Sequence, residues 1–417
     1  MPRSSALWVL AALVLAACKP PTPTAERRFE VRFRPDPVAA SPEAQWLLDR
    51  LPDATWDKGL ARAVFHLTSA ATDRSARLTP SAMARATAIA GYPGHARFAR
   101  ELTGGGWPER LVAQLQDVVN RTPQPVDVAL ARRVHGDGTT LWIAGIAQRP
   151  VLVDPIPRDL DLDELLPVQL EVLAPTSTDP MSRIPDPILF IAPPHGPVQS
   201  YPLDATRARW VDAFHEPGVW RLEVVAQGER DTQVVLLWTQ FVEVDPEPVG
   251  VLPRASTDVQ DPMVAATSLR EAVNALRSDA GLRPLSRFEP FEPLAREHAA
   301  WMASSGRVAH TLPGVTQGVA ARAAAAFHPR ARHRQDLAAA PTWEEALDIV
   351  TLSPGHKRNL LCESCTHLSV GVALEPVVDR PPRLFVVWEV LEFPQGEPMR
   401  GRSDGRMPGG ANVADPG

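Results

Sequence analysis

The chain has 417 residues, 44% of them hydrophobic and 22% charged, so it is long enough to bury a substantial core and to form two or three domains. A formal net charge of −6 and the absence of a long basic run exclude an electrostatic basis for a nucleic-acid partner.

Residues 1–17 have the pattern of a bacterial lipoprotein signal peptide. A basic start is followed by the short apolar run Ala6–Ala16, and Leu15-Ala16-Ala17-Cys18 resembles a lipobox in which Cys18 is lipidated. The run is too short for a stable membrane span, which favours cleavage before Cys18. We therefore expect the chain to reach a membrane through the lipid on Cys18, with residues 18–41 as an extended tether.

The resemblance to lipoproteins also implies a location in the cell envelope. Lys19 follows the cysteine, and it is not the aspartate that usually retains such proteins at the inner membrane. The expected location is therefore the outer membrane.

Residues 42–150 are expected to form a mainly helical domain that ends in a β-hairpin. Apolar residues recur at helical spacing around residues 60–64 and 83–90, and Thr79-Pro80 is typical of the beginning of a helix. The hairpin is predicted from residues 126–134 and 139–146, which flank a Gly-rich turn.

Helical periodicity is lost in residues 151–247, where short β-rich runs are separated by prolines. Residues 220–224 alternate cleanly between apolar and polar after a Pro-Gly turn, as a half-exposed antiparallel strand does. The regular spacing of such runs predicts an immunoglobulin-like β-sandwich, which would act as a spacer or a binding module. Residues 248–261 are expected to be a linker.

Residues 262–394 are predicted to form an α+β domain, followed by a disordered tail at residues 395–417. The pattern predicts four helices and an antiparallel pair of strands, at residues 263–280, 289–304, 318–327, 342–352, 366–375 and 383–392. Between the fourth helix and the first of these strands, Pro354 and Gly355 favour a turn that aims the imidazole of His356.

Several motifs of this domain resemble the bacterial branch of the CAP superfamily (the SCP-like, cysteine-rich secretory and pathogenesis-related family). They are, in order, residues 276–285, residues 294–299, Val308-Ala309-His310-Thr311, residues 353–361 and residues 366–373. The resemblance covers about a third of the chain. It implies an α-β-α sandwich with a central cleft lined by His310 and His356.

The helical domain at residues 42–150 could be a degenerate CAP-like relative or an unrelated helical domain. In favour of the first, Leu60-Ala61-Arg62 matches Leu294-Ala295-Arg296, and a helices-then-hairpin order occurs in both segments. Arg77-Leu78 stands where the C-terminal segment has His310, so such a relative would lack the site.

Two imidazoles in one cleft could bind a divalent metal such as zinc, but zinc prefers four ligands, or three and a water. Where relatives carry Gly-Glu-Asn, this chain has Arg334-Gln335-Asp336, and Gln335 is a poor metal ligand that cannot act as a base. Asp336 is expected on the opposite face of the strand. Glu389 could restore a carboxylate if it faces the cleft, and alternation would then direct Trp388 away from it.

Two further groups of residues have open interpretations. His298 lies in the middle of a predicted helix, where a structural role is the usual one. Cys362 and Cys365 are expected to form a disulfide that fixes the turn carrying His356; half of a metal site, with His367 as the single nearby ligand, and two unpaired thiols are the alternatives.

No serine or cysteine nucleophile with a convincing triad order is apparent in the sequence. We therefore favour a binding or structural role in the envelope over an enzyme, with a small molecule, a lipid or an envelope component as the ligand. The alternatives are a metal-assisted envelope hydrolase and a protein that binds a lipid or a sterol-like ligand, as some CAP proteins do.

Overall fold

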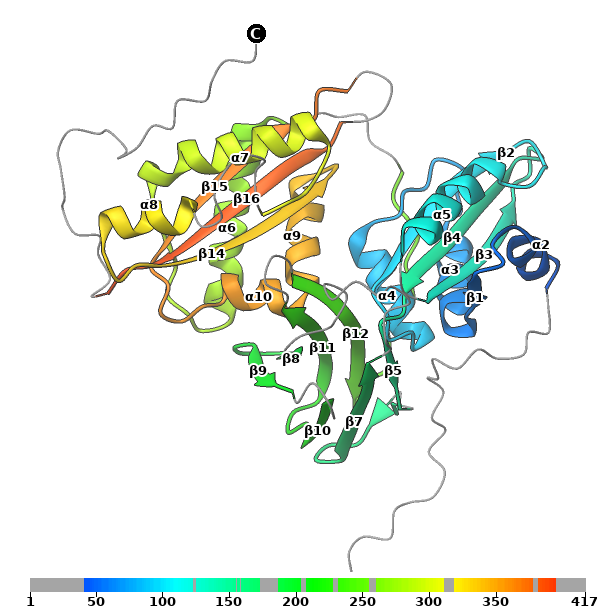
Figure 1. The fold of residues 1–417 in the computed structure, drawn as a ribbon, viewed down its shortest axis with the longest axis horizontal. Helices are drawn as coiled ribbons and strands as arrows, with labels where there is room; N and C mark the ends of the chain where they lie inside the picture. Colours follow the sequence, from blue (N-terminus) through cyan, green and yellow to red (C-terminus); the bar gives the residue numbers. More distant parts are fainter. Residues whose placement is uncertain are drawn as a thin grey trace, which may run out of the picture.

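The computed structural model describes residues 41–122, 125–154, 156–157, 159–172, 187–203, 208–227, 232–254, 260–310, 319–377 and 382–394. They form an N-terminal unit, a middle unit and a C-terminal unit, with the middle unit in contact with both others (Figure 1). Cys18, the tether expected before residue 41 and the tail at residues 395–417 lie outside the described residues. Among the described helices, none has the length and apolar character needed to cross a membrane.

The C-terminal unit is built around a four-stranded sheet in the order β13-β15-β16-β14, in which only the β13–β15 pair is parallel. Its elements are α6 (Pro262–Asp279), β13 (Ser286–Arg287), the 3-10 helix η2 (Glu289–Phe291), α7 (Glu292–Ser305), α8 (Val319–Phe327), β14 (Arg332–Ala340), α9 (Trp343–Leu352), α10 (Pro354–Leu360), β15 (His367–Leu374) and β16 (Leu384–Glu392).

Helices cover both faces of this sheet, as Figure 1 shows. The side chains of α7 pack with Phe385 and Val387 on one face, whereas those of α6 and α9 pack with Val386 and Trp388 on the other. Because successive residues of a strand point to opposite faces, these two clusters are separate cores on either side of the sheet. The result is a layered α-β-α arrangement.

Gly371 permits the close packing of α7 on β15. A Cβ atom at this position would lie within 3.0 Å of backbone atoms of Ala295 and Arg296, closer than real Cβ atoms approach. A larger residue at position 371 would therefore have to push α7 away from the sheet, which would loosen the packing of the core between them.

The segment around His356 is a short helix, α10, and the prediction of a turn was wrong. Ser353 is the N-cap, whose Oγ accepts from the backbone N–H of His356 at 3.3 Å, and Pro354 occupies the first helical position. A helix of seven residues has too few turns for its apolar residues to reveal a period, which explains the error.

The N-terminal unit also contains a four-stranded sheet, in the order β1-β3-β4-β2. Its elements are α2 (Pro42–Arg50), β1 (Ala54–Trp56), α3 (Lys58–Ala70), α4 (Pro80–Ala90), β2 (Ala96–Thr103), α5 (Glu109–Arg121), β3 (Val126–Val134) and β4 (Thr140–Gln148). The expectation of a helical domain with a terminal hairpin was therefore incomplete, because it omitted β1 and β2. The three residues of β1 are too few to show alternation, and β2 has mostly partly exposed residues with little apolar patterning.

The sheets of the N-terminal and C-terminal units share their connectivity. In each, a short first strand pairs in parallel with the third strand along the chain, and the fourth strand pairs antiparallel with both the third and the second. In each unit, helical segments lie before the first strand, between the first and second strands, and between the second and third strands. Among the described elements, α10 has no counterpart in the N-terminal unit.

The middle unit contains two sheets, in the orders β10-β7-β5 and β6-β12-β11-β8-β9. Its strands are β5 (Val151–Val153), β6 (Asp159–Leu160), β7 (Leu165–Val172), β8 (Pro187–Ala192), β9 (Gln199–Pro202), β10 (Ala208–Ala213), β11 (Gly218–Gln227) and β12 (Thr232–Val242). The inward side chains of β11, such as Leu222 and Val224, join a buried apolar cluster that continues into the N-terminal unit. The alternate residues, Arg221 and Glu223, are therefore on the outward face of the larger sheet.

Candidate functional site

Gln335 is the centre of a hydrogen-bonded cluster on the α7 side of the C-terminal sheet. It lies on β14 directly opposite Glu389 on β16, and its Nε2 donates to Glu389 Oε1 at 2.8 Å. Its Oε1 accepts from His310 Nδ1 at 2.9 Å. His310 follows α7 and is exposed. Glu389 thus faces the side on which His310 lies.

His298 and His333 complete this group, which we call the cleft cluster (His298, His310, His333, Gln335 and Glu389). His298 Nε2 donates to the carbonyl oxygen of Ala309 at 2.8 Å, which leaves its Nδ1 to accept from Gln335 Nε2 at 3.2 Å. His333 Nε2 bonds the second oxygen of the fully buried Glu389 carboxylate. Sequence reasoning missed His333, although its position two residues before Gln335 on one strand places both on the same face.

His356 makes no side-chain hydrogen bond to the cleft cluster within the described residues. Its Nδ1 is buried and has no hydrogen-bond partner in the part of the chain that the structure describes. Burial, with the nearby charges of His310 and His95, lowers the pKa of His356 to about 4, so the imidazole is neutral at neutral pH. The structure therefore brings His310, Gln335 and Glu389 together, but it does not join His356 to them.

Two buried polar side chains from distant segments hold the helix that carries His356. At its N-terminus, the Glu223 carboxylate accepts from Gly355 N–H at 2.6 Å and from Ser353 Oγ at 2.9 Å. At its C-terminus, Arg277 Nη1 donates to the carbonyl oxygens of Leu360 (2.7 Å) and Cys362 (2.9 Å). Both side chains are almost completely buried. The cationic Arg277 at the C-terminus complements the dipole of the helix, as Glu223 at the N-terminus does when it is ionised.

A disulfide joins Cys362 to Cys365 directly after α10. Within the described residues, the two sulfur atoms and Glu392 are the only three metal-ligating side chains whose atoms lie within 4.8 Å of one another. Glu392, and not His367, is therefore the third side chain at this place. His310, His356 and Glu389 do not form such a group.

Asp336 occupies the opposite face of β14, as strand alternation predicts. Its Oδ1 accepts from Asn359 Nδ2 of α10 at 2.8 Å, and the residue is fully buried. Burial raises the pKa of Asp336 to about 8 and outweighs the hydrogen bond from Asn359, which acts in the other direction. A third buried acid, Asp336, thus joins Glu223 and Glu389 around α10 and β14.

Replacing Asp336 with Asn should change how stability depends on pH. Because the folded-state pKa of about 8 lies above the ordinary value of 3.8, the folded state holds one more proton between these values. The free energy of unfolding should then fall by about 1.4 kcal/mol per unit as the pH rises from about 4 to about 8. Asp336→Asn cannot ionise, so it should remove this part of the slope.

Urea unfolding of both proteins at pH 5, 6, 7 and 8 would measure the difference. Asp53→Asn is the matched control, because Asp53 is exposed. A slope in Asp336→Asn equal to that of the wild-type chain would contradict the assignment of a buried, protonated carboxyl at this position.

Comparisons with known proteins identify the relatives of the C-terminal unit. Residues 270–388 match the family model of the Cysteine-rich secretory protein family, CAP. The comparison with curated proteins gives no match.

Three solved structures are similar to parts of the chain. An outer surface protein from Borrelia burgdorferi has 21% identity over 31% of this chain and 95% of its own, with a TM-score of 0.27. An extracellular protein containing an SCP domain from Bacillus anthracis has 13% identity over 69% and 93%, with a TM-score of 0.28. A cysteine-rich secretory protein from Staphylococcus aureus has 13% identity over 58% and 86%, with a TM-score of 0.25.

Proposed function

Starting from the CAP domain of the cysteine-rich secretory protein family at residues 270–388, we propose that this chain has a binding or structural role in the cell envelope. Its cleft would recognise a ligand by hydrogen bonding and would not hold a catalytic metal. One observation carries the proposal: the side-chain amide of Gln335 bonds both His310 and Glu389.

The donor set of the cleft cluster fits zinc poorly. Zinc is bound by imidazole, thiolate or carboxylate groups in sets of three or four. Here the amide of Gln335 lies between His310 and the carboxylate of Glu389, and the second oxygen of Glu389 is bonded to His333. The exposed His310 is the group best placed to contact a polar ligand, whereas the Nδ1 of His356 is buried and has no hydrogen-bond partner among the described residues.

Gln335→Glu should create the metal site that the wild-type cleft lacks. A carboxylate at this position would stand beside Glu389 and the imidazoles of His298 and His310, so we expect zinc affinity to rise by on the order of tenfold or more. Gln335→Ala opens the cluster without adding a ligand and serves as the matched control. Isothermal titration with zinc would compare the three proteins.

The alternative function is a metal-assisted hydrolase, which requires an activity measurement beside the titration. Tight zinc binding by the wild-type chain, together with a hydrolytic turnover that His356→Ala abolishes, would contradict the proposed binding role.

We propose that Cys18 carries the lipid that holds the chain at the cell envelope, at the outer membrane. The lipobox-like segment that ends at Cys18 supports the anchor. Cys18→Ser should move the protein from the membrane fraction to the soluble fraction of a cell lysate, because no lipid could then be attached. Lys19→Ala, next to the anchor, is the control that should stay with membranes. Wild-type protein without a lipid mass increment would refute the anchor.

The N-terminal unit is proposed to be a degenerate CAP-like relative. The shared strand order and strand directions of its sheet support this, as does the match of Leu60-Ala61-Arg62 to Leu294-Ala295-Arg296. For the middle unit, the proposal is an immunoglobulin-like sandwich, and the presence of two sheets in this unit supports it. An experimental structure with a different strand order in either unit would contradict the corresponding assignment.

A further inference from the structure

A cavity of about 440 Å³ lies where the three units of the chain meet, and we call it the junction cavity. Its walls come from α4 of the N-terminal unit, from the outward face of β11 and β12, and from Leu352 at the end of α9. This volume is in the range of small-molecule sites, about 300 to 1,000 Å³. None of the residues of the cleft cluster lines it.

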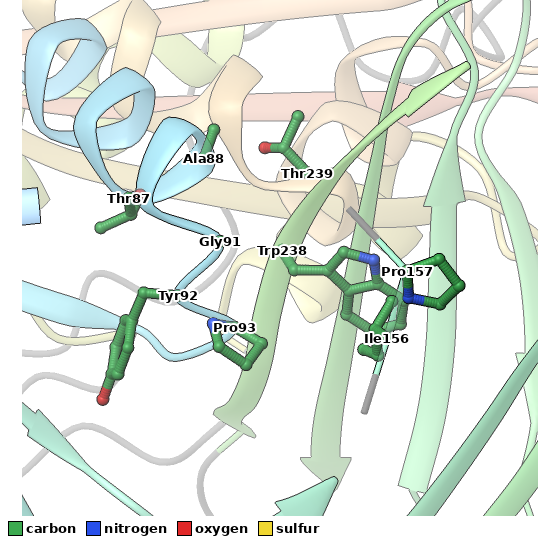
Figure 2. Close-up of a pocket in the computed structure, with 9 residues that line it drawn as sticks. All are labelled: Thr87, Ala88, Gly91, Tyr92, Pro93, Ile156, Pro157, Trp238 and Thr239. Carbon is green, nitrogen blue, oxygen red and sulfur yellow. The ribbon is translucent and has the colours of Figure 1, made fainter. Parts of the chain in front are cut away.

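A second cavity beside it is much smaller. Figure 2 shows this void, of about 20 Å³, between Tyr92 and Pro93 on one side and Trp238 and Ile156 on the other. It shares Ala88 and Thr239 with the junction cavity. A volume of this size holds a water molecule at most, so the junction cavity is the candidate for a ligand.

Arg221 and Thr239 supply the polar groups of the junction cavity. They are cross-strand partners on β11 and β12, and both lie on the outward face of the sheet. Within the described residues, neither side chain has a hydrogen bond, and the Arg221 guanidinium has no ion pair within 4.0 Å. A guanidinium offers five donors that match the oxygen atoms of a carboxylate or a phosphate.

Of the two cations that line the cavity, Arg85 has a bonded carboxylate, whereas Arg221 has none within the described residues. Arg85 pairs with Glu247 at 2.9 Å. Asp348, whose charge acts on Arg221, accepts a hydrogen bond from Ser81. The remaining charged residue of the lining, Asp245, is exposed to solvent. Burial lowers the pKa of Arg221 from its ordinary value, as expected for a cation removed from water without a bonded anion.

The rest of the lining is largely apolar, and it includes Ala84, Ala88, Val219, Phe241 and Leu352. An apolar wall beside a cation without a bonded partner favours a ligand that has both an anionic and an apolar part. A fully polar anion would leave these walls without contacts, and a neutral apolar ligand would desolvate Arg221 without compensation.

We propose that the junction cavity binds a small amphiphilic anion, whose head pairs with Arg221 and Thr239 and whose short apolar chain lies against Phe241 and Leu352. This site is separate from the proposed cleft and does not depend on its function. The ligand would also contact the surroundings of α10, because Leu352 precedes the N-cap Ser353 and Arg221 lies two residues from Glu223 on the same face of β11.

Isothermal titration of the full chain with octanoate and with octyl phosphate tests the proposal, and octanamide is the neutral analogue. We expect saturable binding of at least one of the two anions and none of octanamide. Arg221→Gln should weaken the binding at least about tenfold, since it removes a charged hydrogen-bonding partner. Arg209→Gln, which changes an exposed arginine of the same unit, should leave it unchanged.

A second variant tests the cavity independently of Arg221. Ala84→Phe should fill the cavity and abolish binding while it leaves the guanidinium in place. Circular dichroism of each variant would verify the fold. The proposal would be overturned by the absence of saturable binding of either anion, by equal binding of octanamide, or by binding that survives both substitutions in folded protein.

Discussion

The position of α10 depends on two buried polar side chains that come from outside it. A helix of seven residues has almost no stability of its own, because nucleation costs more than one turn recovers. Glu223 of the middle unit bonds its first turn, and Arg277 of α6 bonds the carbonyl groups at its end. His356 lies between these contacts along the chain, so its position depends on a residue from another unit.

The burial of Glu223 makes the stability of the folded chain depend on pH. Burial raises the pKa of Glu223 to about 7, and the hydrogen bonds from Gly355 and Ser353 act against this rise. Because the folded-state pKa lies above the ordinary value of 4.5, the proton is held below about pH 7 and is lost as the pH rises through it. Glu223 and Asp336 are therefore both neutral in the folded chain at mildly acidic pH, where both stabilise it most.

Local patterns in the sequence predicted most of the CAP domain. The N-caps, glycines and alternating strands indicated the boundaries of α6, α9, β15 and β16 to within a few residues. Alternation predicted that Asp336 faces away from Gln335, but it left the face of Glu389 open, and the pairing of β14 with β16 places Glu389 opposite Gln335. The motifs of the resemblance directed attention to His310, Gln335 and Glu389, which the fold brings together.

The remaining features depend on contacts between residues far apart in the sequence. Glu223 and Ser353 are 130 residues apart, and Arg277 and Leu360 are 83 apart. Alternation shows that Glu223 faces outward from its sheet, but no local signal indicates what that face meets. The junction cavity was missed for the same reason, because its walls come from three separate units.

Amide hydrogen exchange of residues 354–361 in the wild-type chain and in Glu223→Ala is the most direct test of this dependence. Glu171→Ala, at an exposed position of the same unit, is the control. We expect faster exchange in α10 of Glu223→Ala, with the exchange of β15 and β16 unchanged, because the helix would lose the bonds at its first turn while the sheet keeps its core. Exchange in α10 equal to that of the wild-type chain would contradict the claim that the middle unit positions His356.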